Sequence, residues 1–122
     1  MAKRVLIVED EASVLEVFEE FFKILGMETT SARDGEEGLR IFLEEGPFDL
    51  YLIDLKIPKI EGLVLANKIR EKDPEGPIFV FSGMPQLDKE KIEKIPKSVY
   101  FKKPVTFKEI SEYLKKFNLI DG

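Results

Sequence analysis

Short apolar runs alternate with amphipathic segments along this chain, and this alternation limits what the chain can fold into. Residues 5–8, 50–53 and 78–81 are continuous apolar runs rich in β-branched and aromatic side chains. Runs of this kind are typical of strands that are covered on both faces, as in a parallel sheet. Residues 27–31 form a more polar run that suits an edge strand, and residues 99–101 are a short fifth run.

Amphipathic segments that predict helices lie between and after these runs. Apolar side chains recur at three- and four-residue spacing in the first segment, residues 13–25, and Gly26 follows it as a C-terminal stop. The other expected helices are residues 35–45, with Leu39, Phe42 and Leu43 inward, then 63–71, 87–94 and 106 to about 118. The last of these opens with Thr106 and Glu109 at the spacing of a capping box.

Five strands alternating with five helices predict an α/β fold with a doubly wound parallel sheet. Right-handed crossovers place helices on both faces of such a sheet, which makes a three-layer sandwich. The chain has 122 residues, the length of one ordinary domain, and no repeat or flexible linker interrupts it. We therefore expect residues 1–122 to form a single domain with no output domain attached.

Composition excludes several kinds of chemistry. The chain contains neither cysteine nor histidine, which rules out disulfides, zinc–thiolate sites and catalysis by histidine. Its apolar runs are too short for a membrane span or a signal peptide, so we expect a cytoplasmic protein without membrane insertion. Asparagine and glutamine are scarce beside abundant lysine and glutamate, a bias that favours a thermophilic source.

The charge is unevenly distributed along the chain. Residues 1–61 carry 7 basic and 15 acidic side chains, whereas residues 62–122 carry 12 basic and 9 acidic ones, for an overall net charge of −5. An acidic chain of this kind is a poor binder of nucleic acid. The lysine-rich second half fits either an acidic partner or simply solvated helix faces.

Polar side chains follow four of the five predicted strands. Glu9 and Asp10 follow the first run, Asp54 the third, Ser82 the fourth and Lys103 the fifth. Because ligands of open α/β sheets bind beyond the carboxyl ends of the strands, these side chains are expected at one edge. Each alone could merely cap a helix or a turn, but their joint occurrence favours a site.

This set of side chains has a specific chemical meaning. Clustered carboxylates repel one another unless a cation lies among them, and Mg²⁺ prefers oxygen ligands of this kind. An aspartate can attack phosphorus and form an acyl phosphate, and the transferred group then needs a metal, a cation and neutral donors around it. Asp54 as the nucleophile, Asp10 with Mg²⁺, Lys103 and Ser82 would supply that set.

At these residues the sequence resembles the receiver domain of bacterial two-component response regulators. The resemblance extends from Lys3 to about Asn118 and rests on four motifs. These are the acidic pair within 5–11, the run 54–58 with Gly62 beyond it, the pair 82–83, and the run 100–104 with its Lys-Pro step. Each motif is weak alone, but the four together at this spacing are specific.

The resemblance implies a fold and a site. The sheet order would be 2-1-3-4-5, as in flavodoxin-like folds, and Asp54 would accept a phosphoryl group from a sensor histidine kinase or a histidine phosphotransfer protein. Asp10 would bind Mg²⁺ directly, Glu9 would bind it through water, and the backbone carbonyl of Lys56 would be a further ligand. Lys103, before a cis proline, would pair with the phosphoryl group.

The resemblance also implies a switch. Ser82 would hydrogen-bond the phosphoryl group, and Tyr100 would then turn inward. The face formed by residues 87–94, 99–101 and 106–118 would change with it and alter binding to a downstream protein.

Three other functions are weaker interpretations of the same residues. A phosphatase with an aspartyl-phosphate intermediate would need a second acid where Lys56 stands, so we expect no enzyme beyond self-catalysed phosphorylation and hydrolysis. A flavodoxin-like cofactor module would want a phosphate-cradling loop after the first strand, where Glu9, Asp10 and Glu11 repel phosphate. A degenerate receiver that only docks partners would not need the complete set of site residues.

Overall fold

The computed structural model describes residues 2–57, 59–83 and 86–121, so Pro58 of the second motif lies outside the described residues. Five strands alternate with five helices, as the sequence predicts. The strands are β1 (Arg4–Val8), β2 (Glu28–Ala32), β3 (Leu50–Asp54), β4 (Ile78–Ser82) and β5 (Ser98–Lys102). The helices are α1 (Ala12–Ile24), α2 (Gly35–Glu45), α3 (Gly62–Lys72), α4 (Gln86–Glu93) and α5 (Phe107–Lys116).

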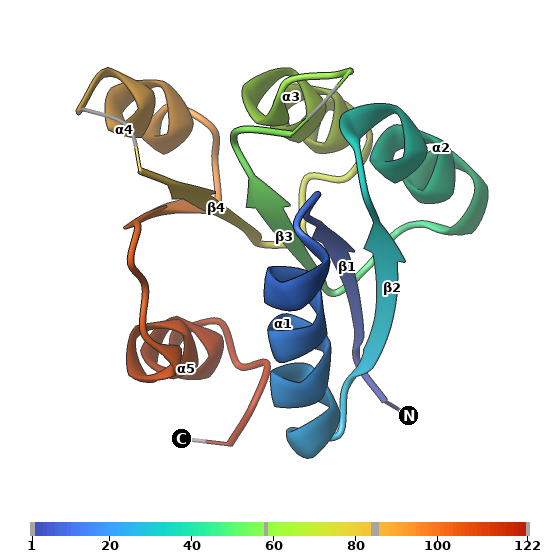
Figure 1. Ribbon diagram of the computed structural model, residues 1–122, viewed down its shortest axis with the longest axis vertical. Helices are drawn as coiled ribbons and strands as arrows, with labels where there is room; N and C mark the ends of the chain where they lie inside the picture. Colours follow the sequence, from blue (N-terminus) through green and yellow to red (C-terminus); the bar gives the residue numbers. More distant parts are fainter. Residues whose placement is uncertain (1, 58, 84–85, 122) are drawn as a thin grey trace.

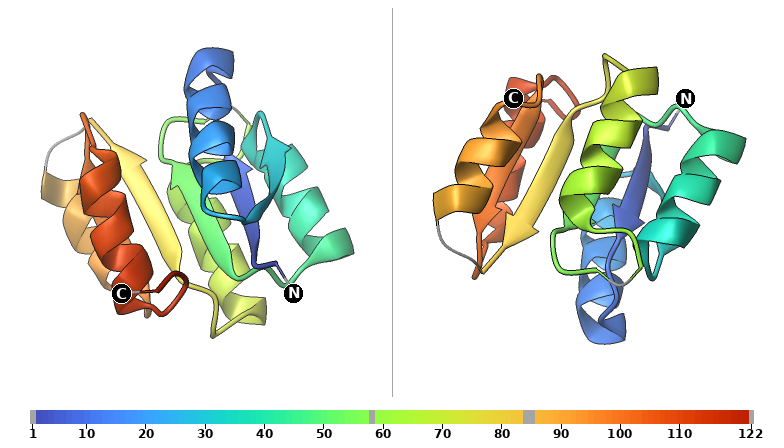
Figure 2. Two further views of the ribbon diagram at one scale, coloured as in Figure 1. Left: turned by 90° about the horizontal axis from the view of Figure 1, so that it is seen from below. Right: turned by 90° about the horizontal axis from the view of Figure 1, so that it is seen from above.

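The strands form one parallel sheet in the order β2-β1-β3-β4-β5. Helices α1 and α5 cover one face of this sheet, and α2, α3 and α4 cover the other (Figures 1 and 2). The expected doubly wound three-layer sandwich with order 2-1-3-4-5 is thus confirmed. The polar strand β2 lies at an edge of the sheet, where it pairs with a single neighbouring strand, β1.

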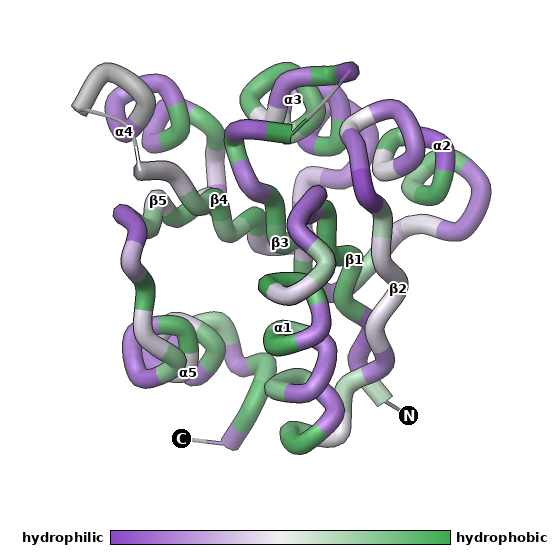
Figure 3. The backbone as a smooth tube through the Cα atoms, viewed as in Figure 1, coloured by the Kyte–Doolittle hydropathy of each residue, from purple (hydrophilic) through white to green (hydrophobic). Residues whose placement is uncertain are grey.

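The core has two halves, one on each face of the sheet. Along β3, Tyr51 and Ile53 pack toward α2, α3 and α4, whereas Leu50 and Leu52 pack toward α1 and α5. Both faces of the central strands are therefore buried, which is why their sequences are continuously apolar instead of alternating. Figure 3 shows that hydrophobic residues predominate in these strands.

The buried face of α2 differs from the expected one. Leu43 is 56% exposed, whereas Ile41 and Phe42 are buried and Leu39 is only partly buried. The helix lies so close to β1 that a Cβ on Gly38 would stand 2.9 Å from Cγ2 of Val8. Hydropathy gives no weight to a glycine contact of this kind. The hydropathy pattern therefore predicts a buried face that includes Leu43 instead of the observed face with Gly38 and Ile41.

The predicted capping box at the start of α5 is present. The hydroxyl of Thr106 accepts a hydrogen bond from the backbone N–H of Glu109 at 3.1 Å, and the Glu109 carboxylate accepts one from the backbone N–H of Thr106 at 3.2 Å. Two N–H groups without partners inside the helix are thereby satisfied. The cap fixes where α5 begins, directly after the segment that carries Lys103.

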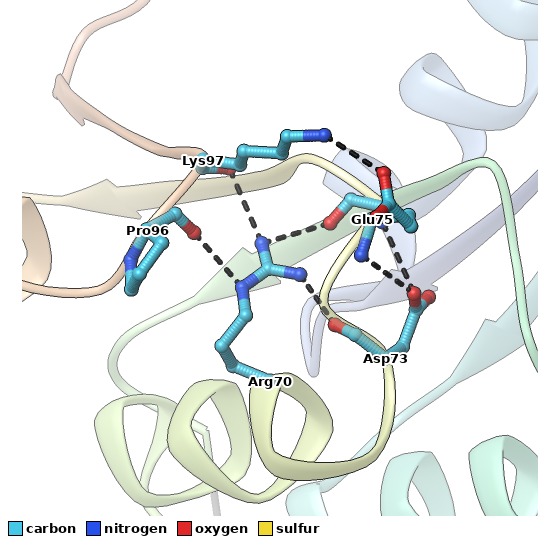
Figure 4. A network of polar contacts seen from close by, with 6 residues as sticks. Arg70, Asp73, Glu75, Pro96 and Lys97 are labelled. Carbon is cyan, nitrogen blue, oxygen red and sulfur yellow. Dashed lines mark hydrogen bonds and ion pairs between the residues drawn. The ribbon is translucent and has the colours of Figure 1, made fainter.

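Arg70 joins two connections at the amino ends of β4 and β5. Its guanidinium donates to the carbonyls of Asp73 at 2.6 Å and Gly76 at 2.8 Å, which precede β4. It also donates to the carbonyls of Pro96 at 2.8 Å and Lys97 at 3.3 Å, which precede β5 (Figure 4). One side chain therefore fixes both strand entries, at the opposite end of the sheet from the candidate site.

Among the helices of residues 2–57, 59–83 and 86–121, none combines the length and the apolar character that crossing a bilayer requires.

Candidate functional site

Three carboxylates converge where β1 and β3 end. These strands are neighbours in register, so the residues that follow Val8 lie beside the end of β3 at Asp54. One oxygen from each of Glu9, Asp10 and Asp54 lies within 4.8 Å of the other two. Glu9 and Asp54 are buried, with 3% and 4% of their surfaces exposed, so the cluster is largely withdrawn from solvent. The sequence prediction that these side chains meet is correct.

Asp54 is held by two donors from different parts of the chain. Its Oδ2 accepts a hydrogen bond from Nζ of Lys103 at 2.6 Å, and its Oδ1 accepts one from the backbone N–H of Lys56 at 2.9 Å. Lys103 follows β5, which is separated from β3 by β4, so its side chain reaches across the end of β4. The Lys103–Pro104 peptide bond is cis, as the resemblance implies.

Ser82 lies on β4, between β3 and β5, and Tyr100 lies on β5, the strand that leads into Lys103. Ser82 ends β4 and is 1% exposed, and its carbonyl accepts a hydrogen bond from the backbone N–H of Lys103 at 2.8 Å. Tyr100 is half-buried, pairs with Val80 in the β4–β5 ladder and packs against the core on the side of α2, α3 and α4. Both therefore belong to the strands that connect the site to the face of α4, β5 and α5.

Lys56 contributes its backbone to the site. Its N–H holds Asp54, and the residue immediately follows the β3 edge, where its carbonyl is a candidate ligand. Its side chain is exposed and forms no ion pair within the part of the chain that the structure describes. Lys56 therefore contacts the site through its main chain, whereas its charged side chain is exposed.

The electrostatics of the site follow from crowding of negative charge in a buried place. Burial is the main cause that raises the pKa of Glu9 from its ordinary value of 4.5 to about 7; the Glu11 N–H opposes this shift and the Asp54 charge adds to it. Burial lowers the pKa of the Lys103 ammonium, but its hydrogen bond to Asp54 and the nearby carboxylates outweigh burial and raise it. Lys103 therefore remains protonated, and it is a single cation beside three carboxyl groups.

The donor set fits a hard divalent cation. Carboxylate oxygens and a backbone carbonyl are the ligands that Mg²⁺ takes, and Mg²⁺ keeps several waters instead of requiring a complete protein cage. Glu9, Asp10 and Asp54 offer three oxygens at suitable mutual spacing. A divalent charge would stabilise the ionised form of Glu9 against the burial and the Asp54 charge that raise its pKa.

We expect Glu9→Gln to stabilise the metal-free protein at alkaline pH. A folded-state pKa raised from 4.5 to about 7 makes the contribution of Glu9 to stability largest below pH 4.5 and removes it as pH rises through 7. At pH 8 the variant should be more stable by about 2–3 kcal/mol, since one pKa unit corresponds to about 1.4 kcal/mol. Urea unfolding in EDTA at pH 8 and pH 4 measures the difference, which should vanish at pH 4.

The control for this experiment is Glu16→Gln, which removes one exposed carboxylate from α1. The amide oxygen introduced by Glu9→Gln can still accept the hydrogen bond that the Glu11 N–H donates to Glu9 at 3.1 Å, so the variant removes charge and keeps this contact. A Glu9→Gln protein no more stable than wild type at pH 8 would show that the cluster carries no electrostatic penalty.

The sequence interpretation missed one residue at this site, Arg33. Its guanidinium donates to the main-chain carbonyl of Asp10 from Nη2 at 2.8 Å and from Nε at 3.2 Å. The available signal was topological: Arg33 follows β2, the strand next to β1, so its position at the same edge follows from the sheet order. Nothing in its residue type or spacing indicates the contact itself.

The fold and the site together define a doubly wound α/β domain with a buried aspartate beside a lysine and an acidic cluster. The family model of the response regulator receiver domain matches residues 5–115. The chain belongs to the response regulator receiver domain family.

Individual relatives agree with this assignment. Sporulation initiation phosphotransferase F of Bacillus subtilis is 28% identical over 118 residues, which cover 96% of this chain and 94% of that protein. The probable transcriptional regulator ycf27 of Porphyridium aerugineum is 31% identical over 93% of this chain, but this chain spans only 47% of that regulator's length. Response regulator TrrA of Thermotoga maritima, solved with Mg²⁺ and BeF, superposes with a TM-score of 0.82 at 31% identity, covering 94% of this chain and 98% of TrrA.

Proposed function

We propose that this chain is a phosphorylation-driven switch in which Asp54 accepts a phosphoryl group. The observation that carries the proposal is the position of Asp54: its carboxylate is buried, 2.6 Å from the Lys103 ammonium and beside the carboxylates of Glu9 and Asp10. A nucleophile, a fixed cation and a set of metal ligands thus meet at one point. Membership in the response regulator receiver domain family and similarity to a phosphotransferase support this function.

The proposed chemistry is the transfer of a phosphoryl group from a histidine nitrogen to a carboxylate oxygen. A carboxylate oxygen of Asp54 attacks the phosphorus of a phosphohistidine on the donor protein, the new O–P bond forms, and the P–N bond breaks with its electron pair going to the imidazole nitrogen. Lys103 pairs with the charge that develops on the phosphoryl oxygens. The Lys56 N–H keeps the carboxylate oriented through Oδ1. Later attack by water on phosphorus releases inorganic phosphate and restores Asp54.

Mg²⁺ would be held by Asp10, Asp54 and the carbonyl of Lys56, with Glu9 acting through water. When bound, it supplies charge neutralisation for the phosphoryl oxygens. The crystallised relative TrrA carries Mg²⁺ together with BeF, which supports Mg²⁺ as the ion for this chain. The three carboxylates of the site provide the matching ligands.

The switch is proposed to run from Ser82 to Tyr100. The Ser82 hydroxyl would donate to a phosphoryl oxygen, and Tyr100 would turn inward in response, changing the face of α4, β5 and α5. The ladder supports this path because Ser82 pairs with Lys102 and Val80 with Tyr100 on adjacent strands. The signal is then read as altered binding to a downstream protein, without direct contact to nucleic acid.

The donor is proposed to be a sensor histidine kinase or a histidine phosphotransfer protein. Similarity to a phosphotransferase over 94% of that protein's length supports a place in a phosphorelay. The transcriptional regulator, by contrast, matches this chain over only 47% of its own length. We further propose that the receiver unit fills residues 1–122 and acts in the cytoplasm, and that its only catalysis is on its own phosphoryl group. Lys56 at the position of a phosphatase's second acid supports that restriction.

The function is tested by Mg²⁺-dependent phosphorylation from a small-molecule donor. Wild-type protein incubated with phosphoramidate and Mg²⁺ should gain one phosphoryl group by intact-protein mass spectrometry. Replacing Mg²⁺ by EDTA should reduce the rate by at least about 100-fold, because the crowded carboxylates then repel the incoming anion. No incorporation with Mg²⁺, or equal incorporation in EDTA, would contradict the proposal.

A further inference from the structure

Arg33 contacts the candidate metal site without contributing a ligand to it. Two of its guanidinium nitrogens, Nη2 at 2.8 Å and Nε at 3.2 Å, donate to the main-chain carbonyl of Asp10. This carbonyl belongs to the loop between β1 and α1, which carries the half-buried Asp10 side chain toward Asp54. The contact therefore acts on the backbone that positions a proposed ligand.

The backbone of Arg33 is itself fixed to the start of α2. Its N–H donates to Oε1 of Glu37 at 2.8 Å, and the N–H of Glu37 donates to Oδ1 of Asp34 at 2.7 Å. These two bonds tie residues 33 and 34, the β2–α2 turn, to the first turn of a helix. The guanidinium thus extends from a rigid base, which is what a positioning contact requires.

The same turn also meets the loop after β3, which carries Lys56. Asp34 forms an ion pair with Lys59 at 3.5 Å, and a Cβ on Gly35 would stand 2.1 Å from the carbonyl oxygen of Ile60. The β2–α2 turn and the first residue of α2 therefore contact the loops after β1 and β3, which carry Asp10 and Lys56. Among the described residues, Arg33 donates from this turn to the main chain of Asp10, a proposed ligand.

We infer that Arg33 is a positioning residue for the metal site, which it serves by holding the main chain of Asp10 in its ligand-presenting conformation. The inference rests on the proposed function only in taking Asp10 as a metal ligand. The Arg33 side chain has two opposing effects on the affinity for the metal ion. Its positive charge repels a divalent cation, whereas its hydrogen bonds reduce the conformational freedom that Asp10 would lose on binding. Arg33 is exposed, so solvent and salt screen the repulsion, and positioning dominates.

The test measures divalent-metal affinity in wild type, Arg33→Gln and Arg33→Lys, with Mn²⁺ as the probe and free Mn²⁺ read by electron paramagnetic resonance. Arg33→Gln should weaken Mn²⁺ binding by about three- to tenfold, and Arg33→Lys, which keeps one donor group and the charge, should fall between it and wild type. Arg40→Gln is the matched control, because it removes an arginine charge from α2 whose ion-pair partner among the described residues is Glu44. Its affinity should equal that of wild type.

A second readout needs no metal and no phosphorylation. Amide hydrogen exchange in EDTA should be faster at residues 10–12 in Arg33→Gln than in Arg40→Gln, while the strands keep their protection. Binding of Mn²⁺ by Arg33→Gln that equals or exceeds that of wild type would overturn the inference, as would unchanged exchange at residues 10–12. Because neither readout requires an acyl phosphate, failure of phosphorylation in wild type would count against the proposed function and leave this result intact.

Discussion

Asp54→Asn is expected to abolish phosphoryl incorporation from phosphoramidate. The amide has no anionic oxygen with which to attack phosphorus, so the loss should exceed about 100-fold and reach the detection limit. Asp10→Asn should differ in kind, because it removes a proposed Mg²⁺ ligand and leaves the nucleophile. Its phosphorylation should be slow at low Mg²⁺ and recover in part as the Mg²⁺ concentration rises.

The Asp54→Asn experiment has an internal check on folding. Asp54 is one of three crowded carboxylates, so its replacement removes repulsion from the cluster and should not unfold the protein. Glu16→Gln, an exposed change on α1, should be phosphorylated like wild type. Incorporation by a folded Asp54→Asn protein at a rate comparable to wild type would assign the acceptor to another residue.

Arg70→Met should cause a large loss of stability. The methionine keeps the aliphatic stem but removes the hydrogen bonds that the guanidinium donates to four carbonyls preceding β4 and β5. Those of Asp73 and Gly76 are bound in a partly buried environment, so their loss is not fully compensated by water. We expect a loss of about 2–3 kcal/mol, which lowers the melting temperature by about 8–15 °C.

Lys72→Met is the matched control for Arg70. Lys72 lies on the last turn of the same helix, is exposed and takes part in no ion pair of the described residues. Thermal unfolding followed by circular dichroism should therefore separate the two variants clearly. Equal melting temperatures for Arg70→Met and Lys72→Met would mean that the network of Figure 4 is replaceable by solvent.

Much of the fold follows from local pattern. Strands buried on both faces must be continuously apolar, so β1, β3 and β4 are visible in the sequence, and a polar strand such as β2 can be tolerated only at an edge. The face of α2 was harder to predict because Gly38, which contacts Val8, has no hydropathic signal. Tyr51 likewise reads as one more apolar strand residue, although its hydroxyl donates to Asp73 at 2.6 Å.

The candidate site was predictable to the extent that topology alone positions it. Parallel strands end at one edge, so Glu9, Asp10 and Asp54 had to meet once the strand order was set. The same topology places Lys103 at this edge, whereas its pairing with a phosphoryl group is implied by the resemblance to receiver domains. The Arg33–Asp10 contact depends on a side-chain conformation across 23 residues of sequence, which no local pattern encodes.

Borohydride reduction of the phosphorylated wild-type protein identifies the residue that carries the phosphoryl group, which we propose to be Asp54. Borohydride reduces an aspartyl phosphate to homoserine, and peptide mass spectrometry then locates the altered residue. Homoserine at position 54, absent when Mg²⁺ is replaced by EDTA during phosphorylation, is the expected result. Homoserine at position 10, a reduced glutamate at position 9, or no reduced residue in a protein that has gained a phosphoryl group would contradict the account.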